Sequence, residues 1–309
     1  MPIALVGPTA TGKTAVGILL AAALGTEIIG CDSRQVYRRL DVGTAKPTPA
    51  ERSRVRHHLV DVVEPTERYN AARYREEVHA LLSACPACAR IPLFVGGTGL
   101  YLRAALEGLC PAPASIPSLR RWLATLAATI PDGPHPLLAR IDPHAAARIH
   151  PNDRYRITRA LEVFYLSGQT LTAHHKHHRI ARPPRAARIF AIDLDATAIR
   201  LRIDMRLEAM MEAGFLDEAR RLLEEGIDPG LPALRAVGYP ELFAHLRGES
   251  TLDAAMTAIR RATWQYARRQ LTWFRAEPGV TWIPADATTS AAALAAAVLR
   301  HLRVPGCAP

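Results

Sequence analysis

The chain has 309 residues, of which 49% are hydrophobic and 22% are charged, a composition typical of a globular protein with one large domain or two modest ones. Its longest apolar run, residues 15–24, is about half as long as a membrane span, and its first residues do not have the pattern of a secretion signal. We therefore expect a cytoplasmic protein without a membrane partner. Its formal net charge of +10 indicates a binding partner with negative charge.

The first hundred residues alternate short apolar runs with segments of helical spacing. Strands are expected at residues 3–6, 27–30, 59–63 and 91–95, and helices at residues 12–24 and 71–83. Strands that alternate with helices predict a parallel sheet that is covered by helices on both faces. This part of the chain therefore predicts an α/β fold.

The first expected strand leads directly into a glycine-rich loop. The loop matches the P-loop pattern at every fixed position and reads Gly7-Pro8-Thr9-Ala10-Thr11-Gly12-Lys13-Thr14. In such a loop several backbone N–H groups point at a phosphate, and the following helix adds its positive N-terminal end. Lys13 supplies a charge for the outer phosphate oxygens, and Thr14 can ligate Mg²⁺. The loop specifies a di- or triphosphate but not the group that is attached to it.

Two proline-rich segments, residues 110–117 and 182–185, divide the chain. Between them the pattern becomes helical and basic, and after them residues 189–194 are expected to form another strand before further helices. We therefore expect a P-loop NTPase-like α/β core that is interrupted by a mostly helical insertion domain. The expected bounds are residues 1–114 and 189–309 for the core and residues 115–188 for the insertion.

The positive charge is concentrated in the expected insertion. Residues 119–190 contain twelve Lys and Arg residues against four acids, a net charge of +8, together with seven of the twelve histidines. A small metabolite needs no such field, whereas a nucleic acid does. The alternative is a solvated basic surface that keeps the protein soluble.

Asp32 directly follows the second expected strand, where small-metabolite kinases resembling shikimate kinase place an acidic residue. The loop and Asp32 therefore fit a P-loop kinase. Against this, the strand at residues 91–95 ends in Gly96-Gly97-Thr98 rather than in an acid. A GTPase-like switch protein is a third interpretation, but the chain has no N-K-x-D-type sequence that could read guanine.

The cysteines and histidines of the chain include candidate metal ligands. The odd number and scattered spacing of the cysteines do not suggest a disulfide framework. Cys85 and Cys88 have metal or redox spacing, but no second pair or nearby Cys-His pair completes a site, so a structural or incidental role is expected. The histidine-rich residues 174–178 lack metal partners, and we expect a polar, mobile stretch there. For His57 and His58 a packing role is expected.

Short motifs continue along the chain after the loop. They are Asp32-Ser33-Arg34-Gln35-Val36-Tyr37, Gly43-Thr44-Ala45-Lys46-Pro47, His57-His58-Leu59-Val60-Asp61, Val95-Gly96-Gly97-Thr98-Gly99-Leu100-Tyr101, His150-Pro151-Asn152-Asp153, Arg159-Ala160-Leu161-Glu162, Val237-Gly238-Tyr239 and Arg268-Arg269-Gln270-Leu271-Thr272-Trp273-Phe274-Arg275. In this order the motifs resemble those of the bacterial tRNA dimethylallyltransferase family, and the resemblance covers residues 7–275.

The resemblance implies transfer of the dimethylallyl group of dimethylallyl diphosphate to N6 of the adenosine 3′ of the tRNA anticodon, with Mg²⁺ assisting. The phosphates at Lys13 would then be the leaving group, stabilised by the loop and by Mg²⁺ at Thr14. Asp32 would orient the adenine amine and take its proton, unless it serves only as a Mg²⁺ ligand. Thr98 matches a position that hydrogen-bonds near the amine and diphosphate, and is otherwise a turn hydroxyl.

Further contacts are carried over from the resemblance. Arg220 is expected as a second diphosphate ligand, with Arg221 as its substitute and a solvated helix charge as the alternative. Arg235 and Tyr239 suit phosphate anchoring and base stacking, whereas Pro240 departs from the polar or basic residue that is common there. The expected tRNA contacts are Asp32, Ser33, Arg34, Gln35, Thr98, Arg120, Tyr155, Arg156, Ile157, Thr158, Arg159, Arg235, Ala236, Val237, Gly238, Tyr239, Pro240, Arg268, Arg269 and Arg275.

Residues 257–275 contain five arginines and no acid. On a helical wheel Arg261, Arg268 and Arg275 form one stripe beside an apolar stripe, so one face is expected to pack while its neighbour meets RNA phosphate. A similar group of enzymes, the cytokinin-type isopentenyltransferases, uses a free adenine nucleotide as acceptor; the basic insertion favours tRNA instead. We expect a monomer.

Overall fold

The computed structural model describes residues 1–129, 133–181 and 186–302. The chain divides into two compact units, Met1–Leu106 with Ala186–Pro309, and Glu107–Arg185. We call them the core unit and the insertion. The sequence placed the start of the insertion at residue 115, but the chain leaves the core unit where helix α5 (Gly99–Glu107) ends. The second expected boundary, at residue 188, falls inside a strand of the core unit.

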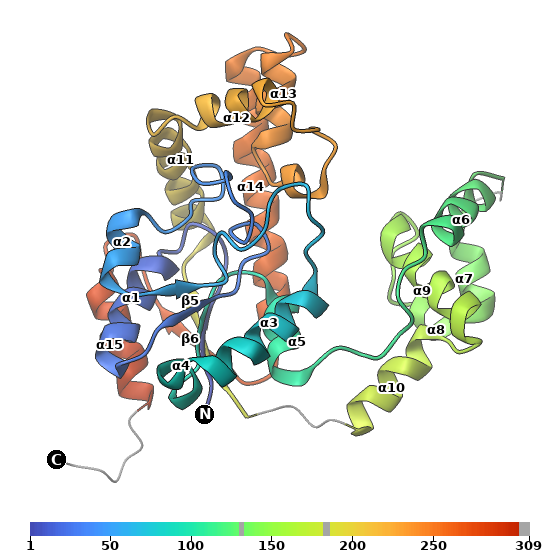
Figure 1. Cartoon of the computed structure of the whole chain (residues 1–309), viewed down its shortest axis with the longest axis horizontal. Helices are drawn as coiled ribbons and strands as arrows, with labels where there is room; N and C mark the ends of the chain where they lie inside the picture. Colours follow the sequence, from blue (N-terminus) through green and yellow to red (C-terminus); the bar gives the residue numbers. More distant parts are fainter. Residues whose placement is uncertain (130–132, 182–185, 303–309) are drawn as a thin grey trace. The chain divides into compact units, whose positions relative to one another are not determined.

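The core unit is built on a sheet of six parallel strands, in the order β3-β2-β4-β1-β5-β6 (Figure 1). The strands are β1 (Ile3–Val6), β2 (Ile28–Gly30), β3 (His57–His58), β4 (Leu93–Val95), β5 (Arg188–Asp193) and β6 (Val280–Pro284). The strands β1, β2 and most of β4 are buried apolar runs, as expected where helices cover both faces of a parallel sheet. The predicted α/β class is therefore confirmed.

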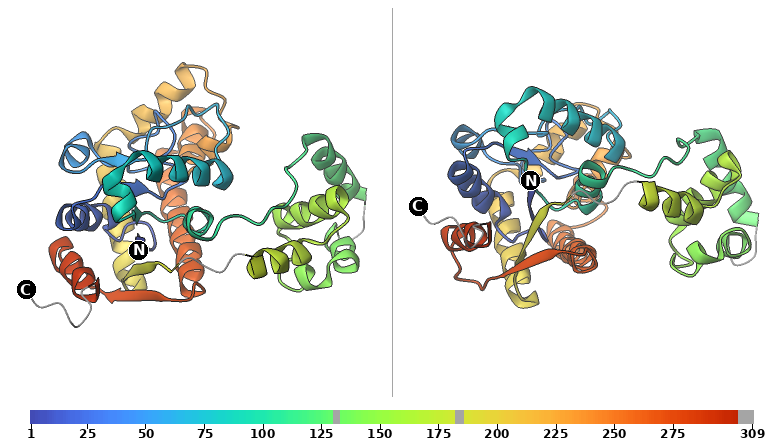
Figure 2. Two further views of the ribbon diagram at one scale, coloured as in Figure 1. Left: turned by 60° about the horizontal axis from the view of Figure 1, so that its bottom comes forward. Right: turned by 90° about the horizontal axis from the view of Figure 1, so that it is seen from below.

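Helices lie on both faces of this sheet, and α1 packs beside α15 on one of them (Figure 2). Besides α5, the helices of the core unit are α1 (Lys13–Leu24), α2 (Pro49–Arg54), α3 (Ala71–Ala84), α4 (Pro86–Arg90), α11 (Ala196–Glu212), α12 (Phe215–Glu224), the 3₁₀ helix η1 (Pro232–Arg235), α13 (Tyr239–Leu246), α14 (Leu252–Arg275) and α15 (Ala291–Leu302). Among the described residues, no helix is long and apolar enough to cross a membrane.

Among the described residues, two apolar clusters that bear on the site contribute to the core unit. One joins the sheet to α1, α15 and the second half of α14, where Ala267 and Leu271 are buried as the helical wheel predicted. The other gathers α12, α13 and the first half of α14 around Phe215 and Tyr239. Because the second cluster also contains Val36, which follows β2, it supports the chain just beyond the carboxyl end of that strand.

Two elements differ from the sequence predictions. The strand expected at residues 59–63 is wrong, because Leu59 and Asp61 have φ values of 59° and 58°, which no strand accommodates. Pairing with β2 occurs two residues earlier, in β3, and Val63 forms only an isolated bridge to Tyr37. At the other end of the sheet, β6 was expected as part of a helical region.

The insertion is helical, as predicted. Its helices are α6 (Pro117–Thr129), α7 (His135–Ile141), α8 (Pro143–Ala146), α9 (Arg154–Ser167) and α10 (Leu171–Ala181). They enclose a small apolar core that includes Leu138 and Ile157. The expectation of a mobile histidine stretch is wrong, because residues 174–178 lie within α10 and His174 contacts Ser167 Oγ through Nε2 at 3.0 Å.

Candidate active site

The phosphate loop connects the buried strand β1 to helix α1. Gly12 is the N-cap of α1 and has a φ of 84°, in the left-handed region that favours glycine, and Ala10 shares this region with a φ of 65°. Thr11 is fully buried, and its hydroxyl donates to Pro8 O at 3.0 Å, which closes the loop internally. Alternation between left- and right-handed backbone is the geometry in which successive N–H groups converge on an anion.

Lys13 is the first residue of α1 and lies inside the loop. Its Nζ donates to Pro8 O at 2.5 Å. Burial, together with the positive charge of Arg206, lowers the pKa of Lys13 to about 7, and the carboxylate of Asp32 opposes this shift. A bound diphosphate would favour the charged ammonium, so this lysine is tuned to respond to an anion.

The segments that carry Asp32 and Thr98 meet because they follow neighbouring parallel strands, β2 and β4, although only Asp32 lines the cavity described below. The two chains approach so closely at Gly96 that a Cβ there would lie 2.1 Å from Cys31 O. Thr98 Oγ1 accepts a hydrogen bond from Ser33 N at 3.0 Å, and Asp32 Oδ1 accepts one from Arg34 N at 2.8 Å. The backbone itself therefore holds the Asp32 carboxylate in place.

The loop and Asp32 open into one cavity of about 350 Å³. It is lined by residues from the loop, from the segments after β2 and β4, and from α11 and α14. Among the expected site residues, those in its wall are Thr9, Ala10, Gly12, Lys13, Thr14, Asp32, Arg34, Gln35, Arg235, Ala236, Val237 and Arg269. The wall therefore combines several basic side chains and the phosphate loop with the carboxylate of Asp32.

Arg206, on α11, is a wall residue that the sequence did not reveal. Its Nη1 donates to Thr9 Oγ1 at 3.3 Å, at the phosphate loop. Arg220, expected in this role, does not line the cavity; its guanidinium pairs with Asp217 one turn earlier on α12. The structure therefore has Arg206, rather than the expected Arg220, at the phosphate loop, because the folded chain brings α11 to the loop.

Gln270 and Tyr266, both on α14, also line the cavity without having been singled out. Gln270 Oε1 accepts a hydrogen bond from Thr9 N at 2.8 Å, and its Nε2 donates to Gly97 O at 3.0 Å. It thus joins the phosphate loop to the segment after β4. The sequence did contain a signal for Gln270, because this polar residue interrupts the apolar stripe that carries Ala267 and Leu271, and a buried polar side chain needs hydrogen-bond partners.

Glu218, on α12, organises the segment that supports Gln35. Its buried carboxylate accepts hydrogen bonds from the backbone N–H groups of residues 41–43 and from the Tyr239 hydroxyl at 2.7 Å. The carbonyls of Thr44 and Ala45 then accept both hydrogen bonds from Gln35 Nε2, at 3.1 and 3.0 Å. The segment thereby fixes Gln35 in the cavity wall.

Tyr239 was expected to stack on a base, and the structure corrects this. Its side chain is fully buried, packs edge-on against Phe215 and donates its hydroxyl to Glu218. Gly238 is also buried, because a Cβ there would lie 2.6 Å from Phe215. Of the expected contact segment 235–240, Arg235 and Pro240 are exposed.

In the insertion, several expected contact residues surround Glu162, which is fully buried. Its carboxylate accepts hydrogen bonds from Ile116 N and Ser115, and pairs with Arg120 and Arg159. Arg120 and Arg159 therefore stabilise the fold of the insertion through Glu162, in addition to any contact with a partner.

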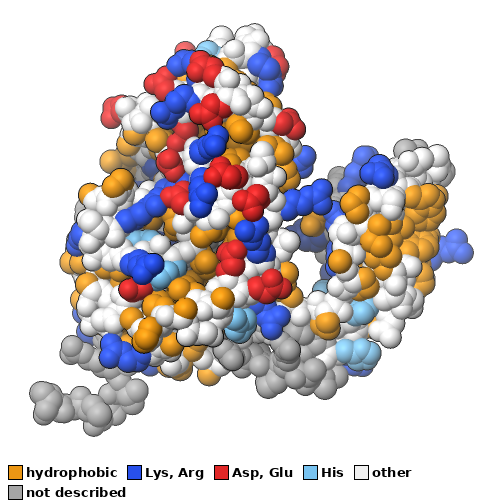
Figure 3. Space-filling view, in the orientation of Figure 1, with side chains coloured by type: hydrophobic (Ala, Val, Ile, Leu, Met, Phe, Trp, Pro, Cys, Tyr) orange, Lys and Arg blue, Asp and Glu red, His pale blue; other side chains and the backbone are white. Residues whose placement is uncertain are grey.

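The residues of the 155–159 segment divide by exposure. Ile157 is buried in the core of the insertion, so the expectation of a side-chain contact there is wrong, and Thr158 is half-buried. Tyr155 and Arg156 are exposed, and the Arg120 guanidinium lies 5.4 Å from the centre of the Tyr155 ring. Hydrophobic side chains gather on the visible face of the insertion in Figure 3, and Trp122 and Tyr165 are among its exposed aromatic residues.

Helix α14 carries both of its predicted faces. Arg261, Arg268 and Arg275 are exposed, while Leu271 and Phe274 are buried. Arg269, also exposed, lies in the wall of the cavity. The helix therefore runs from the sheet core along the cavity with a basic outer face.

Fold and site define a P-loop protein of the α/β class in which the loop and the carboxylate of Asp32 line one cavity. A family model described as IPP transferase matches residues 35–277, and one described as Isopentenyl transferase matches residues 2–66. The chain therefore belongs to the IPP transferase family.

Curated relatives carry the name tRNA dimethylallyltransferase. That of Syntrophobacter fumaroxidans is 46% identical over 274 residues, which cover 88% of this chain and 80% of the relative. That of Roseiflexus sp. is 45% identical over 291 residues, which cover 93% of each. The full-length tRNA isopentenylpyrophosphate transferase of Bacillus halodurans matches with a TM-score of 0.72 at 34% identity, over 97% of this chain and 95% of its own. A eukaryotic dimethylallyltransferase acting on tRNA matches with a TM-score of 0.75 at 26% identity, over 93% of this chain and 74% of its own.

Proposed function

We propose that this chain transfers the dimethylallyl group of dimethylallyl diphosphate to N6 of the adenosine 3′ of the anticodon in tRNA, releasing diphosphate. The observation that carries the proposal is the single cavity that Asp32 lines together with the phosphate loop, Lys13 and Arg206. Relatives that share up to 46% of their residues with this chain are tRNA dimethylallyltransferases.

The phosphates in the loop are the leaving group in this reaction. Negative charge grows on the diphosphate as its bond to the allylic carbon breaks. The N–H groups of the loop, Lys13 and Arg206 supply fixed positive charge where that growth occurs, which favours the transition state over the bound substrate. Thr9 connects Arg206 to the loop, because its hydroxyl accepts a hydrogen bond from Arg206. Its backbone N–H donates to Gln270.

Asp32 acts on the attacking amine. The N6 lone pair of adenine is delocalised into the ring, so the amine gains nucleophilicity when a carboxylate accepts a hydrogen bond from it and takes its proton. Two backbone N–H groups hold Asp32 Oδ1, at 2.8 and 3.3 Å, which orients the carboxylate toward the cavity that it lines. Thr98 supports the same segment through Ser33 N.

The residues at the loop fit a Mg²⁺ ion. Thr14 lines the cavity at the loop, and its hydroxyl is an oxygen ligand of the kind that this cation takes beside phosphate. When bound, Mg²⁺ supplies further positive charge for the departing diphosphate.

The acceptor is a tRNA loop rather than a free nucleotide. The target base must leave its stack to reach an enclosed site, and such loops are held by phosphate contacts and by stacking on aromatic and arginine planes. The chain offers exposed basic and aromatic residues for this, namely Tyr155, Arg156, Arg235, Arg268 and Arg275, together with the half-buried Arg120. A protein that meets tRNA in a bacterium works in the cytoplasm, and we propose that it does so as a monomer.

The test is a transfer assay with purified protein, Mg²⁺, labelled dimethylallyl diphosphate and unmodified tRNA. Label is expected in N6-modified adenosine after digestion of the tRNA, and none when AMP, ADP or ATP replaces the tRNA. Transfer to a free nucleotide alone would contradict the proposed acceptor. Absence of any transfer, together with ATP-dependent phosphorylation of a metabolite, would support a P-loop kinase and overturn the proposal.

A further inference from the structure

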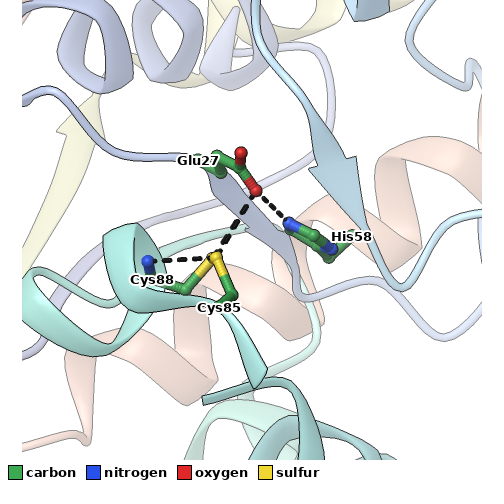
Figure 4. A group of neighbouring side chains, drawn as sticks. All are labelled: Glu27, His58, Cys85 and Cys88. Atoms are coloured by element: carbon green, nitrogen blue, oxygen red, sulfur yellow. Dashed lines mark hydrogen bonds and ion pairs between the residues drawn. A yellow bond between two sulfur atoms is a disulfide. The ribbon is translucent and has the colours of Figure 1, made fainter. Parts of the chain in front are cut away.

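Four side chains with metal-binding atoms meet away from the active site (Figure 4). They are Glu27, His58, Cys85 and Cys88, and their ligand atoms all lie within 4.8 Å of one another. Glu27 precedes β2, His58 ends β3, and the two cysteines belong to the short helix α4 and its N-cap. The sequence showed the cysteine pair but not its partners, because the fold brings these in from distant positions.

The Glu27 carboxylate is the centre of this group. Its Oε2 lies 2.5 Å from His58 Nε2, 3.5 Å from Cys85 Sγ and 3.8 Å from Cys88 Sγ. In a tetrahedral zinc site with ordinary bond lengths, oxygen and sulfur ligands are about 3.5 Å apart and oxygen and nitrogen ligands about 3.3 Å apart. The two distances from Glu27 Oε2 to the sulfur atoms are already close to this oxygen–sulfur value. The distance to His58 Nε2 would have to increase by less than one ångström.

We propose that the reduced form of this group binds one Zn²⁺ ion through Cys85, Cys88, His58 and Glu27. The ligand set of two thiolates, one imidazole and one carboxylate is the kind that zinc takes in closed structural sites. Such a site needs partial burial, and here Cys88 is fully buried while the other three are half-buried. Cys88 N donates to Cys85 Sγ at 3.2 Å, a contact that stabilises a thiolate.

In the structure Cys85 and Cys88 are joined as a disulfide. Zinc binding therefore follows a two-electron reduction by a thiol or phosphine reductant, which converts the disulfide into two thiols. Each thiol then loses one proton as its sulfur binds the metal, so two protons are released for each Zn²⁺ taken up. The proposed cytoplasmic location favours the reduced pair, because that compartment keeps thiols reduced.

The ion would join α4 to the β2–β3 edge of the sheet. The hydrogen bonds between them include the Thr26 hydroxyl, which is shared between Ala87 O and Ile91 O at 3.1 and 2.8 Å, and Arg90 Nη2, which donates to Gly25 O at 3.2 Å. Strand β3 has only two residues. His57 and His58 are consecutive in β3, and successive strand residues point to opposite faces. His57 lines the active-site cavity, so the ion would hold the other face of the same strand.

The test measures metal, not transfer activity, and so is independent of the proposed function. Protein expressed in zinc-supplemented medium is purified with a phosphine reductant, and its zinc content is measured by mass spectrometry. About one Zn²⁺ per chain is expected. The double variant Cys85→Ser/Cys88→Ser should lose it, while Cys110→Ser, a matched change at a cysteine outside the group, should keep it.

Cobalt substitution keeps the proposal testable if the double variant folds poorly. Reduced wild-type protein with Co²⁺ should show the intense visible bands of a tetrahedral ion and a thiolate charge-transfer band. His58→Gln and Glu27→Gln keep both cysteines and should weaken Co²⁺ binding at least about tenfold in competition with a chelator. Reduced protein without metal, or equal zinc in the double variant and Cys110→Ser, would overturn the proposal. So would a Cys85–Cys88 disulfide that persists when cells are lysed directly into an alkylating reagent.

Discussion

Arg206 reaches across from α11 to the phosphate loop, where its Nη1 lies 3.3 Å from the hydroxyl of Thr9. This contact places a guanidinium near Lys13, at the loop where we propose that the leaving diphosphate binds. Arg206→Ala should therefore lower kcat/KM for dimethylallyl diphosphate about 10²- to 10³-fold, the usual cost of removing one donor to developing negative charge. Inhibition by added diphosphate should weaken in parallel, which steady-state kinetics can measure.

Arg220→Ala is the matched control for this prediction. Arg220 pairs with Asp217 at the surface of α12 and does not line the cavity. Its replacement should leave both kinetic parameters nearly unchanged. A large loss in Arg220→Ala with normal activity in Arg206→Ala would restore the assignment that the sequence suggested.

Asp32→Asn should reduce dimethylallyl transfer about 10²- to 10⁴-fold, since the amide cannot take the proton of the adenine amine. The asparagine side-chain oxygen can still accept from Arg34 N, so the segment keeps its conformation. Binding of tRNA, measured by fluorescence anisotropy, should stay close to the wild-type value. A comparable loss of tRNA binding would argue against the role as base, and Asp217→Asn serves as an exposed control.

The pH dependence of the reaction should report Lys13. Because burial and Arg206 lower the pKa of Lys13 to about 7, the free enzyme loses this positive charge as the pH rises through that value. The kcat/KM for dimethylallyl diphosphate should therefore fall above pH 7, while kcat falls only at higher pH, since bound diphosphate stabilises the ammonium.

Two variants check the origin of this pH effect. Arg206→Gln removes the neighbouring positive charge, so the fall in kcat/KM should move to higher pH. Lys13→Arg keeps its charge throughout and should abolish that fall, whatever its absolute rate. An unchanged profile in both variants would show that another group controls the dependence.

The sequence predicted the parts of this protein that short segments determine. The loop from Gly7 to Thr14 follows from local backbone requirements, and Asp32 was expected directly beyond β2, where the structure has it. Arg206 and the grouping of Glu27 with Cys85 could not be predicted, because each depends on how distant elements pack. The prediction that Tyr239 stacks on a base was wrong for a related reason. Its motif identifies the residue but does not reveal that the side chain is buried against Phe215.

Glu218→Gln should destabilise the core unit by about 1–3 kcal/mol, the cost of leaving buried hydrogen-bonding groups unsatisfied. The carboxylate accepts four hydrogen bonds, from residues 41–43 and the Tyr239 hydroxyl, and an amide NH₂ group cannot accept those at Oε2. Urea denaturation measures the change. Because the same segment holds Gln35 in the cavity wall, the KM for tRNA should rise as well. A stability loss with unchanged KM would separate the two roles.

Two arginines on α9 should respond differently to removal. Arg156 is exposed at the helix start and pairs with Asp153, whereas Arg159 pairs with the buried Glu162 and donates to Pro113 O at 2.8 Å. Arg156→Ala should weaken tRNA binding and reduce the slope of log K against log salt by about one, with little effect on thermal unfolding. Arg159→Ala should instead lower the stability of the insertion by about 1–3 kcal/mol, because Glu162 loses a charged partner. Equal salt slopes in wild type and Arg156→Ala would show that this arginine does not contact RNA phosphate.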